Sequence, residues 1–402
     1  MQMDVRTTKK FQSVTVNNWE WSISDPAILE PWFDSWKEVA RKNMVKSNRV
    51  RAVFKVESGG KTYYVKFNHP LSLASRIHSS IIPKSKSEFL SALQLKEHGI
   101  PSIEICGWAR KGHESMLITR ELENSVNARN YWFSEASTRA ELKEKFLDSF
   151  SEFLRKIMSS CFFHPDFHLG NLMLGKDDMK FSLVDPYGVE KKSRLTDAQV
   201  FKMIRIIGSF RGEINDREAG EILLKARLAK DFSAADEIWY DVLKAEADEM
   251  EKLWAKRKEQ VLAGKASYCR VFQSALGQGM SIRNSMDGRA MIDNRILMDE
   301  NFEKRYQSVR LTEAEARELW LISFHLQFHR ITHKMPLAWI KINEAENILV
   351  YPKTVIINTI KTETVGEFLK RCRAAGIKKD ISPRLAESED GRIYLSDIRD
   401  LL

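Results

Sequence analysis

Strand-like runs alternate with a single helical stretch in the first third of the chain. Four runs are rich in β-branched and aromatic residues, which favours strands: 51–57, 61–67, 103–109 and 115–120. Ser58-Gly59-Gly60 separates the first two runs and is typical of a hairpin turn. Between the second and third runs, apolar residues recur at helical spacing from Ser85 to a stop at Gly99. This order predicts a β-rich segment that holds one helix.

Helical spacing dominates the chain after residue 138. Apolar residues recur at intervals of three and four along 139–160, which predicts an amphipathic helix, and 197–260 reads as mostly helical and heavily charged. Two short apolar runs, 172–174 and 181–184, predict a hairpin between these helices. The order of elements therefore predicts an α+β fold with two lobes.

The two ends of the chain carry shorter signals. Near the start, Val14–Val16 reads as a short strand, and Asp25–Asn43 reads as an amphipathic helix that carries Trp32 and Trp36. Residues 265–304 mix polar and short strand-like runs. The remaining predictions for the last third are helices at 317–330 and 364–375 and a final strand at 393–395.

Composition narrows the class of protein. A chain of 402 residues with 43% hydrophobic residues is long enough to bury a sizeable core, and it contains no low-complexity tract. The four cysteines are far apart and form no CxxC pair, so we expect a reducing compartment and neither a disulfide framework nor a zinc site. The start of the chain has no apolar segment typical of a signal peptide, and no run of about 18 apolar residues predicts a membrane span.

The net charge of +9 favours anionic partners such as nucleotide phosphates or anionic lipid headgroups. An ordinary solvated surface explains the same charge equally well. No nucleic-acid-binding motif accompanies the charge, so we expect no nucleic-acid partner.

The segment from His164 to Tyr187 carries the clearest chemical signal. Asp166 and Asn171 share one loop, and Asp185 directly follows the predicted hairpin, so the hairpin brings it back beside that loop. Phosphoryl transfer from ATP requires a carboxylate to orient the attacking hydroxyl, hard oxygen ligands for Mg²⁺ and a cation on the phosphates. A surface loop with capping residues explains one of these polar residues but not three in this arrangement.

A lysine suited to the phosphates lies upstream. Lys66 ends a strand-like run, the context expected for a lysine that holds the α- and β-phosphates of ATP. Its usual partner is a glutamate on the next helix, and Glu88 lies at the start of that helix, with Glu97 near its end as the alternative.

Residues from about 47 to 190 resemble the lipopolysaccharide core kinases, the Kdo/heptose kinase group of the protein-kinase-like superfamily. The resemblance rests on Phe54–Lys66, Lys86–Pro101 and the loop around Asp166. That loop, with His168 and Gly170 between Asp166 and Asn171, is also similar to the loop of aminoglycoside and choline phosphotransferases.

The resemblance implies a β-rich N-lobe and a helical C-lobe. It implies Asp166 as the catalytic base, Asn171 and Asp185 as Mg²⁺ ligands, and Lys66 with Glu88 as the pair that holds the phosphates of ATP. We expect His164 to support the loop, and the role of His168 stays open. The chain departs from the protein-kinase pattern in lacking a glycine-rich G-x-G-x-x-G loop, in having Pro165 where an arginine is usual, and in reading Asp-Pro-Tyr at 185–187.

The chain also aligns with itself, which indicates an internal repeat. In this alignment Asn294 takes the place of Lys66, so the second copy is not expected to catalyse transfer; an unrelated α+β appendage is the alternative. The aligned pairs are Phe153–Cys161 with Phe368–Gly376, Asp178–Asp185 with Asp390–Asp397, Ser58–Lys66 with Met286–Asn294, and Glu88–Pro101 with Glu318–Pro336.

These observations predict the following division of the chain: a lead-in at 1–45, a kinase-like N-lobe at 46–125, a kinase-like C-lobe at 126–265 and a degenerate kinase-like region at 266–402. We expect an ATP- and Mg²⁺-dependent kinase that phosphorylates a sugar hydroxyl of a lipopolysaccharide-type glycolipid at the cytoplasmic face of the inner membrane. The basic stretch 76–86 suits such an anionic acceptor, although it is equally compatible with a solvated loop. The alternatives are a kinase for a small molecule or a protein, and a non-catalytic pseudokinase-like regulator.

Overall fold

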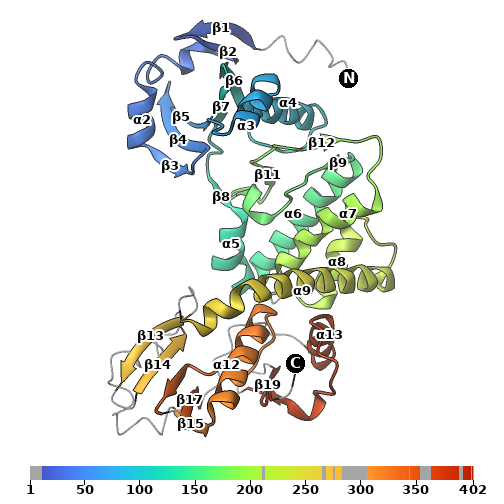
Figure 1. Ribbon diagram of the computed structural model, residues 1–402. Helices are drawn as coiled ribbons and strands as arrows, with labels where there is room; N and C mark the ends of the chain where they lie inside the picture. Colours follow the sequence, from blue (N-terminus) through green and yellow to red (C-terminus); the bar gives the residue numbers. More distant parts are fainter. Residues whose placement is uncertain are drawn as a thin grey trace. The chain divides into compact units, whose positions relative to one another are not determined.

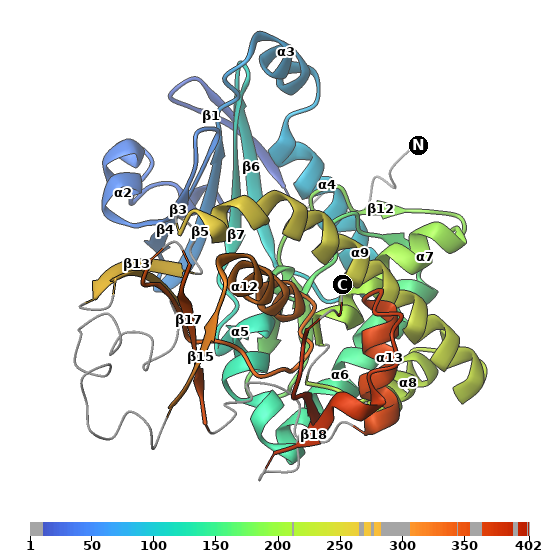
Figure 2. The same ribbon diagram turned by 60° about the horizontal axis from the view of Figure 1, so that its bottom comes forward.

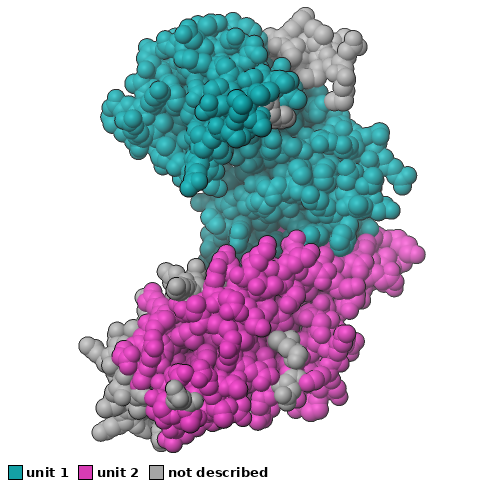
Figure 3. All heavy atoms as spheres, in the orientation of Figure 1, with its two compact units in different colours: residues 1–209, 222–228 teal, residues 210–221, 229–402 magenta. Residues whose placement is uncertain are grey.

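The protein divides into two compact units in a computed structural model. Unit 1 comprises Met1–Ser209 with Ile222–Leu228, and unit 2 comprises Phe210–Glu221 with Ala229–Leu402 (Figure 3). The chain is mixed α+β with a large antiparallel sheet, which confirms the predicted fold class at that level. The structure describes residues 11–210, 213–264, 269–274, 277–282, 306–343, 345–353, 364–388, 393–399 and 401.

Unit 1 contains a seven-stranded sheet with the strand order β1-β2-β6-β7-β5-β4-β3 (Figure 1). Every neighbouring pair in it is antiparallel. The strands are β1 (Gln12–Val16), β2 (Trp19–Ile23), β3 (Met44–Ser47), β4 (Arg51–Ser58), β5 (Lys61–Asn68), β6 (Ile105–Lys111) and β7 (Glu114–Arg120).

The hairpin β4–β5 forms as its sequence predicts. Gly59 and Gly60 make the turn with φ values of 56° and 70°, a region that glycine adopts without steric cost. Phe54 and Val65 pair across the two strands and are both fully buried in a core that β2 shares through Trp19 and Trp21.

The helices of unit 1 lie before, within and after this sheet. They include α2 (Trp36–Lys42), α3 (Leu73–Ile81), α4 (Lys84–Glu97), α5 (Ala128–Ser134), α6 (Ala140–Ser159) and α7 (Asp197–Ile204), while α8 (Asp216–Lys225) spans the boundary between the units. On α6 the buried residues Phe146, Phe150 and Leu154 recur every fourth position, and both phenylalanines contact Phe181 edge-on.

Two smaller sheets complete unit 1 beside these helices. β8 (Ser125–Asn127), β10 (Leu172–Gly175) and β11 (Phe181–Leu183) form one, in the order β11-β10-β8, and β9 (Phe162–Phe163) pairs with β12 (Glu190–Lys191) in the other. The predicted hairpin at 172–184 is therefore confirmed as β10–β11.

The helix predicted at Asp25–Asn43 is wrong in its extent. Only the 3₁₀ turn η1 (Pro26–Ile28) and α2 are helical there, and Trp32 lies between them. Pro31 interrupts the stretch because proline lacks the N–H that a helix interior requires. The indole of Trp32 instead donates to the carbonyl of Ile28 at 2.7 Å.

Unit 2 combines long helices with a five-stranded antiparallel sheet of order β13-β14-β16-β17-β15. Among the described residues, no helix has both the length and the apolar character needed to cross a bilayer. The elements are α9 (Phe232–Leu262), β13 (Cys269–Ser274), β14 (Gly277–Ile282), β15 (Tyr306–Leu311), α12 (Glu313–Phe328), β16 (Ala338–Lys341), β17 (Asn347–Pro352), α13 (Val365–Ala374), β18 (Leu385–Glu387) and β19 (Ile393–Leu395).

The sheets of the two units share their strand order. The series β1-β2-β6-β7-β5 in unit 1 matches β13-β14-β16-β17-β15 in unit 2. Helix α4, preceded by α3, lies between β5 and β6 along the chain, and α12 lies between β15 and β16. The register also matches: Leu117 faces both Trp108 and Lys66, as Leu349 faces both Trp339 and Val309.

The backbone after each of these helices repeats as well. Gly99 and Arg330 end α4 and α12 with φ values of 65° and 54°. A few residues later an isolated parallel bridge forms in each unit, Ser102 with Leu183 and His333 with Leu395. The amide of Leu183 donates to Pro101 at 3.0 Å, and the amide of Leu395 donates to Thr332 at the same distance.

This pattern revises two pairings in the predicted repeat. Thr332, rather than Pro336, occupies the place of Pro101, because it accepts the equivalent hydrogen bond. Val309 of β15 occupies the place of Lys66, whereas Met286–Asn294, the segment aligned with it by sequence, lies outside the described residues.

Candidate functional site

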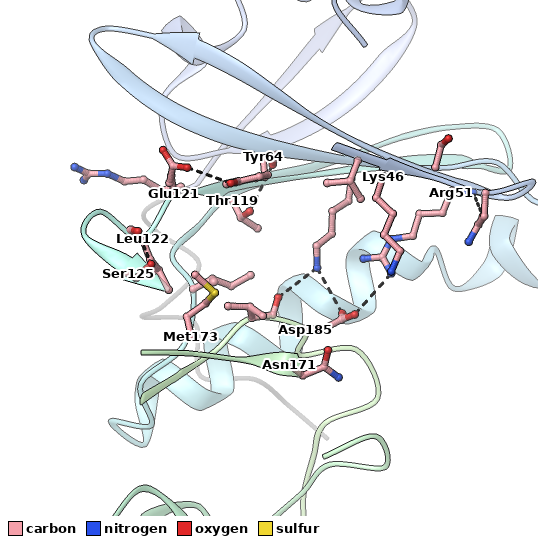
Figure 4. Close-up of a pocket in the computed structure, with 17 residues that line it drawn as sticks. Lys46, Arg51, Tyr64, Thr119, Glu121, Leu122, Ser125, Asn171, Met173 and Asp185 are labelled. Atoms are coloured by element: carbon pink, nitrogen blue, oxygen red, sulfur yellow. Dashed lines mark hydrogen bonds and ion pairs between the residues drawn. The ribbon is translucent and has the colours of Figure 1, made fainter. Parts of the chain in front are cut away.

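A cavity of about 400 Å³ in unit 1 is lined by three of the polar residues singled out in the sequence, Lys66, Asn171 and Asp185 (Figure 4). Strands β4, β5 and β7 form one wall, and the segment around β10 and β11 forms the other. The charged and amide-bearing residues among its lining are Lys46, Asn48, Arg51, Lys66, Arg120, Glu121, Asn171 and Asp185.

Lys66 and Glu88 form a buried ion pair at one side of this cavity. The Lys66 Nζ atom lies 3.0 Å from the Glu88 Oε2 atom, and the Glu88 side chain is fully buried. Strand alternation explains the placement, because Tyr63 and Val65 face the core of the sheet and leave Lys66 on the opposite face, toward α4. Glu97, the alternative partner, is exposed near the end of α4.

The ammonium group of Lys66 also reaches the other wall. Its Nζ atom lies 3.5 Å from the Asp185 Oδ1 atom and 3.4 Å from the carbonyl oxygen of Val184. Arg51 contacts the same two acids, at 3.7 Å from Asp185 and 3.9 Å from Glu88. Two cations from the sheet thus face one carboxylate of the opposite wall.

Asn171 and Asp185 lie close together because the hairpin between them closes. The amide of Val184 donates to the carbonyl of Asn171 at 3.0 Å, directly beyond the cross-strand pair Leu172 and Leu183. In Figure 4 the Asn171 and Asp185 side chains lie on the same side of the cavity, facing the strand that carries Arg51. The sequence prediction that these residues converge is consistent with this geometry.

His164 links the Asp166 loop to Asp185. Its Nδ1 atom accepts from the backbone N–H of Asp166 at 3.1 Å, so its Nε2 atom carries the proton and donates to the carbonyl of Asp185 at 3.0 Å. This bonding pattern fits a neutral imidazole, and burial lowers the pKa of His164. His164 therefore has the supporting position expected for it.

Asp166 lies on the solvent side of the site. Its side chain is 75% exposed, and it is joined to Asn171, whose Nδ2 atom donates to the Asp166 carbonyl at 3.0 Å and approaches its carboxylate at 3.4 Å. The Nε2 atom of His168 lies 3.5 Å from the same carboxylate. The Asp166 carboxylate is therefore accessible from solvent.

The charges around Asp185 favour its ionised form. Burial by itself would raise the pKa of this carboxyl, but the positive charges of Lys66, Arg51 and Lys84 outweigh that effect and lower it. Conversely, burial and the neighbouring charge of Arg51 lower the pKa of Lys84. The site therefore presents a carboxylate within a field of positive charge.

The sequence did not identify Arg51 as a site residue, and it singled out Lys84 only as part of the basic stretch 76–86. Arg51 is the first residue of β4, where strand propensity says nothing about which residue it contacts across the cavity. Lys84 starts α4 and lies 4.2 Å above the ring of Tyr187. The sequence contained one indication of this contact: Tyr187 lies two residues after the candidate metal ligand Asp185, and an aromatic ring attracts a nearby cation.

A second group of residues with metal-ligand chemistry lies in unit 2. Glu251 of α9 accepts contacts from His325 and His329 of α12, whose Nε2 atoms lie 2.6 and 3.4 Å from one carboxylate oxygen. The two imidazoles lie four positions apart on the same helical face. This contact joins α9 to α12, and it is separate from the cavity of unit 1.

No protein-family model and no curated protein matches this chain.

Proposed function

We propose that unit 1 is an ATP- and Mg²⁺-dependent kinase with a protein-kinase-like arrangement of lobes, and that it transfers the γ-phosphate of ATP to a hydroxyl group. The observation that carries the proposal is the meeting of Lys66, paired with Glu88, and the Asn171–Asp185 pair across one cavity. Phosphoryl transfer depends on such positioned charges far more than on covalent chemistry by the protein.

The residues of the cavity suit a magnesium nucleotide. Asp185 and the amide oxygen of Asn171 are the hard oxygen ligands that Mg²⁺ prefers. Bound there, the ion would neutralise charge on the transferring phosphoryl group. The mixed polar and apolar lining, with Val53, Ile103 and Met173 between the charged groups, suits a nucleotide base.

Each side chain has a defined part in this proposal. Lys66, oriented by Glu88, holds phosphate oxygens of ATP as an ammonium group, and Arg51 adds a second positive charge. Asp166 orients the acceptor hydroxyl and accepts its proton. His164 holds the Asp166 backbone and the Asp185 carbonyl together, so that the base and the metal ligand keep a fixed separation.

A sugar hydroxyl on a lipopolysaccharide core or lipid A-type glycolipid is the acceptor we propose. The resemblance of residues 47 to 190 to the Kdo/heptose kinases supports this choice, and the positive charge of the chain suits an anionic glycolipid. A location at the cytoplasmic face of the inner membrane follows from the same proposal.

For unit 2 we propose a degenerate copy of the same fold that does not transfer phosphate. Its support is the shared strand order and the equivalent parallel bridges. Val309 stands in the place of Lys66 in the strand register. Arg384 stands in the place of Asn171, because its carbonyl accepts from the backbone N–H of Ser396 as the Asn171 carbonyl accepts from the backbone N–H of Val184. Neither replacement can hold a phosphate–metal complex by the same contacts.

Mg²⁺-dependent ATP turnover by the full chain tests the catalytic proposal. Asp166→Ala is expected to lower turnover by about 10²–10⁴-fold, the contribution typical of a general base. Asp241→Asn, which removes an exposed carboxylate from α9, is the matched control and should retain full turnover. The proposal would be contradicted if the wild-type chain showed no Mg²⁺-dependent ATP turnover with any acceptor tested. It would also be contradicted if Asp166→Ala were fully active.

Transfer of labelled phosphate then identifies the acceptor. Extracted lipopolysaccharide core, free sugars and a generic protein are offered in parallel to the wild-type chain and to Asp166→Ala. Label that enters only the lipopolysaccharide, and only with the wild-type chain, supports the glycolipid. Label in free sugars or protein instead would favour the other two kinase classes and overturn the glycolipid assignment.

A further inference from the structure

Helix α3 presents an apolar face to solvent. Leu73, Ile77 and Ile81 recur every fourth position along it and have exposed fractions of 75%, 56% and 74%. Leu71 and Ile82, just outside the two ends of the helix, are each 54% exposed. Five large aliphatic side chains within twelve positions (71 to 82) therefore contact water, which a soluble surface normally avoids in contiguous patches.

The orientation of α3 is inverted relative to an ordinary surface helix. Among the positions of α3 whose exposure is described, Ser75 and Ser79 are half-buried, while the aliphatic side chains point outward. Core burial therefore does not explain why this segment carries leucine and isoleucine every fourth residue. A contiguous apolar face of this kind is typical of a site that contacts an apolar partner or a membrane.

Charge identifies the kind of environment. The segment His69–Ser87 contains Arg76, Lys84 and Lys86 and no aspartate or glutamate, in a chain that has 55 acidic residues in all. Arg76 and Lys86 are exposed. A helix with an apolar face flanked by cations is typical of segments that lie in the interface of a bilayer with anionic lipids.

The segment after α3 leads into α4, whose Glu88 pairs with Lys66 of the cavity in unit 1. Ser85 anchors the start of α4 through buried hydrogen bonds of 3.1 Å with Asn68 and with Ser115. The Nζ atom of the adjacent Lys84 lies 4.2 Å from the ring centroid of Tyr187, two residues after Asp185. Ile81 and Ile82 are thus within three positions of Lys84, and Figure 2 shows α3 at the end of unit 1, beyond the strands of its sheet.

We propose that α3, with Leu71 and Ile82, docks unit 1 onto the surface of an anionic phospholipid bilayer. The aliphatic side chains enter the boundary between headgroups and acyl chains, and Arg76 and Lys86 contact the anionic headgroups. The biological purpose of this docking rests on the proposed function, because it brings the cavity to an acceptor held in a membrane. The docking itself requires neither ATP nor catalysis.

Co-sedimentation of the full chain with vesicles tests the docking. Vesicles of phosphatidylcholine with phosphatidylglycerol are compared with vesicles of phosphatidylcholine alone. We expect binding to the anionic vesicles that is at least tenfold stronger and that weakens as the salt concentration rises. Equal binding to both kinds of vesicle, or to neither, would overturn the proposal.

Two variants assign the binding to α3. The triple variant Leu73→Ser, Ile77→Ser and Ile81→Ser should lose binding at least tenfold, since burying each aliphatic side chain contributes about tenfold or more in affinity. The control replaces three exposed apolar residues elsewhere, Phe133, Val271 and Val365, by serine and should bind like wild type. The double variant Arg76→Glu with Lys86→Glu keeps the aliphatic face and should lose the preference for anionic vesicles. It tests docking independently in case the triple serine variant does not fold.

The readouts separate this proposal from the proposed function. Asp166→Ala should bind vesicles like wild type, because docking does not involve the catalytic base. Vesicle binding that persists without any ATP turnover would leave docking intact and refute the kinase. Turnover without vesicle binding would refute docking alone. If the wild-type chain does not bind vesicles but self-associates, and the triple serine variant is monomeric, a second copy of the chain covers α3 instead.

Discussion

At the scale of single residues, the site depends on charges that the fold keeps out of water. Lys66 and Glu88 are both buried, and a buried charge whose partner is removed destabilises a protein by about 3–5 kcal/mol. The partial contact of Arg51 with Glu88, at 3.9 Å, offsets some of that cost. Stability and the proposed catalysis would therefore both depend on the ammonium group of Lys66, and a double substitution can separate them.

Lys66→Met should lower ATP turnover by about 10²–10³-fold and reduce the free energy of unfolding by a few kcal/mol. The double variant Lys66→Met with Glu88→Leu should recover most of the stability, because no unpaired charge remains buried, but none of the turnover. Chemical denaturation and ATP turnover on the same samples provide the measurement. Recovery of activity along with stability would show that the pair is only structural.

His333 should make stability depend on pH. Burial lowers its pKa from 6.5 to about 4, so between these values the unfolded chain binds a proton that the folded chain does not. Stability is then fully present above pH 6.5 and falls as the pH drops, by about 2 kcal/mol at pH 5. Denaturation at pH 7.5 and pH 5 should show this loss in wild type and a smaller one in His333→Gln; equal losses would refute the assignment.

At the scale of elements, the sequence predicted the helices and strands whose hydrophobic pattern matches the residues that they bury. The hairpin β4–β5, helix α4 and helix α6 appear close to their expected bounds, because turn glycines and a core-facing period act locally. Helix α3 was not predicted, since its aliphatic residues face solvent and resemble a loop flanked by proline. The stretch 197–260 was predicted as mostly helical, and it contains α7, α8 and most of α9, but the sequence did not give the bounds of the separate helices.

The residues of the site show the same division. Lys66, Asn171 and Asp185 were predicted because each stands at a recognisable place next to a strand or hairpin. Arg51 was missed, since its contact with Asp185 arises only when β4 packs opposite the hairpin β10–β11. Contacts between elements distant in sequence follow from tertiary packing, which single-residue propensities do not contain.

The close approach of β2 and β6 offers a prediction at this scale. A Cβ atom on Gly107 would lie 2.9 Å from the Ser22 carbonyl oxygen and from the Ile23 side chain, so Gly107→Ala must push the strands apart. We expect a loss of about 1–3 kcal/mol in the free energy of unfolding. Gly366→Ala in α13 is the control. A Cβ atom on Gly366 would lie 3.9 Å from the Thr364 Oγ1 atom, an ordinary contact, so the change should be neutral or stabilising by about 0.5–1 kcal/mol. Equal destabilisation by both changes would contradict this account.

At the scale of the whole molecule, the chain repeats one arrangement of strands, helix and hairpin with different chemistry. Asp185 and Asp397 each lie two residues beyond the parallel bridge of their unit. Asp185 faces Lys66 and Arg51 across a cavity, whereas Asp397 is bound by the neighbouring guanidinium of Arg399, which holds its pKa at about 2. The equivalent backbone position thus serves a candidate metal site in one unit and a local ion pair in the other.

The most direct test compares these two aspartates in one assay. Mg²⁺-dependent ATP turnover is measured for Asp185→Asn and Asp397→Asn in the full chain, at a temperature where both variants remain folded. We expect turnover to fall by at least about 10²-fold in Asp185→Asn and to stay within about twofold of wild type in Asp397→Asn. Full turnover in Asp185→Asn, or an equal loss in both variants, would contradict the assignment of phosphoryl transfer to the cavity of unit 1.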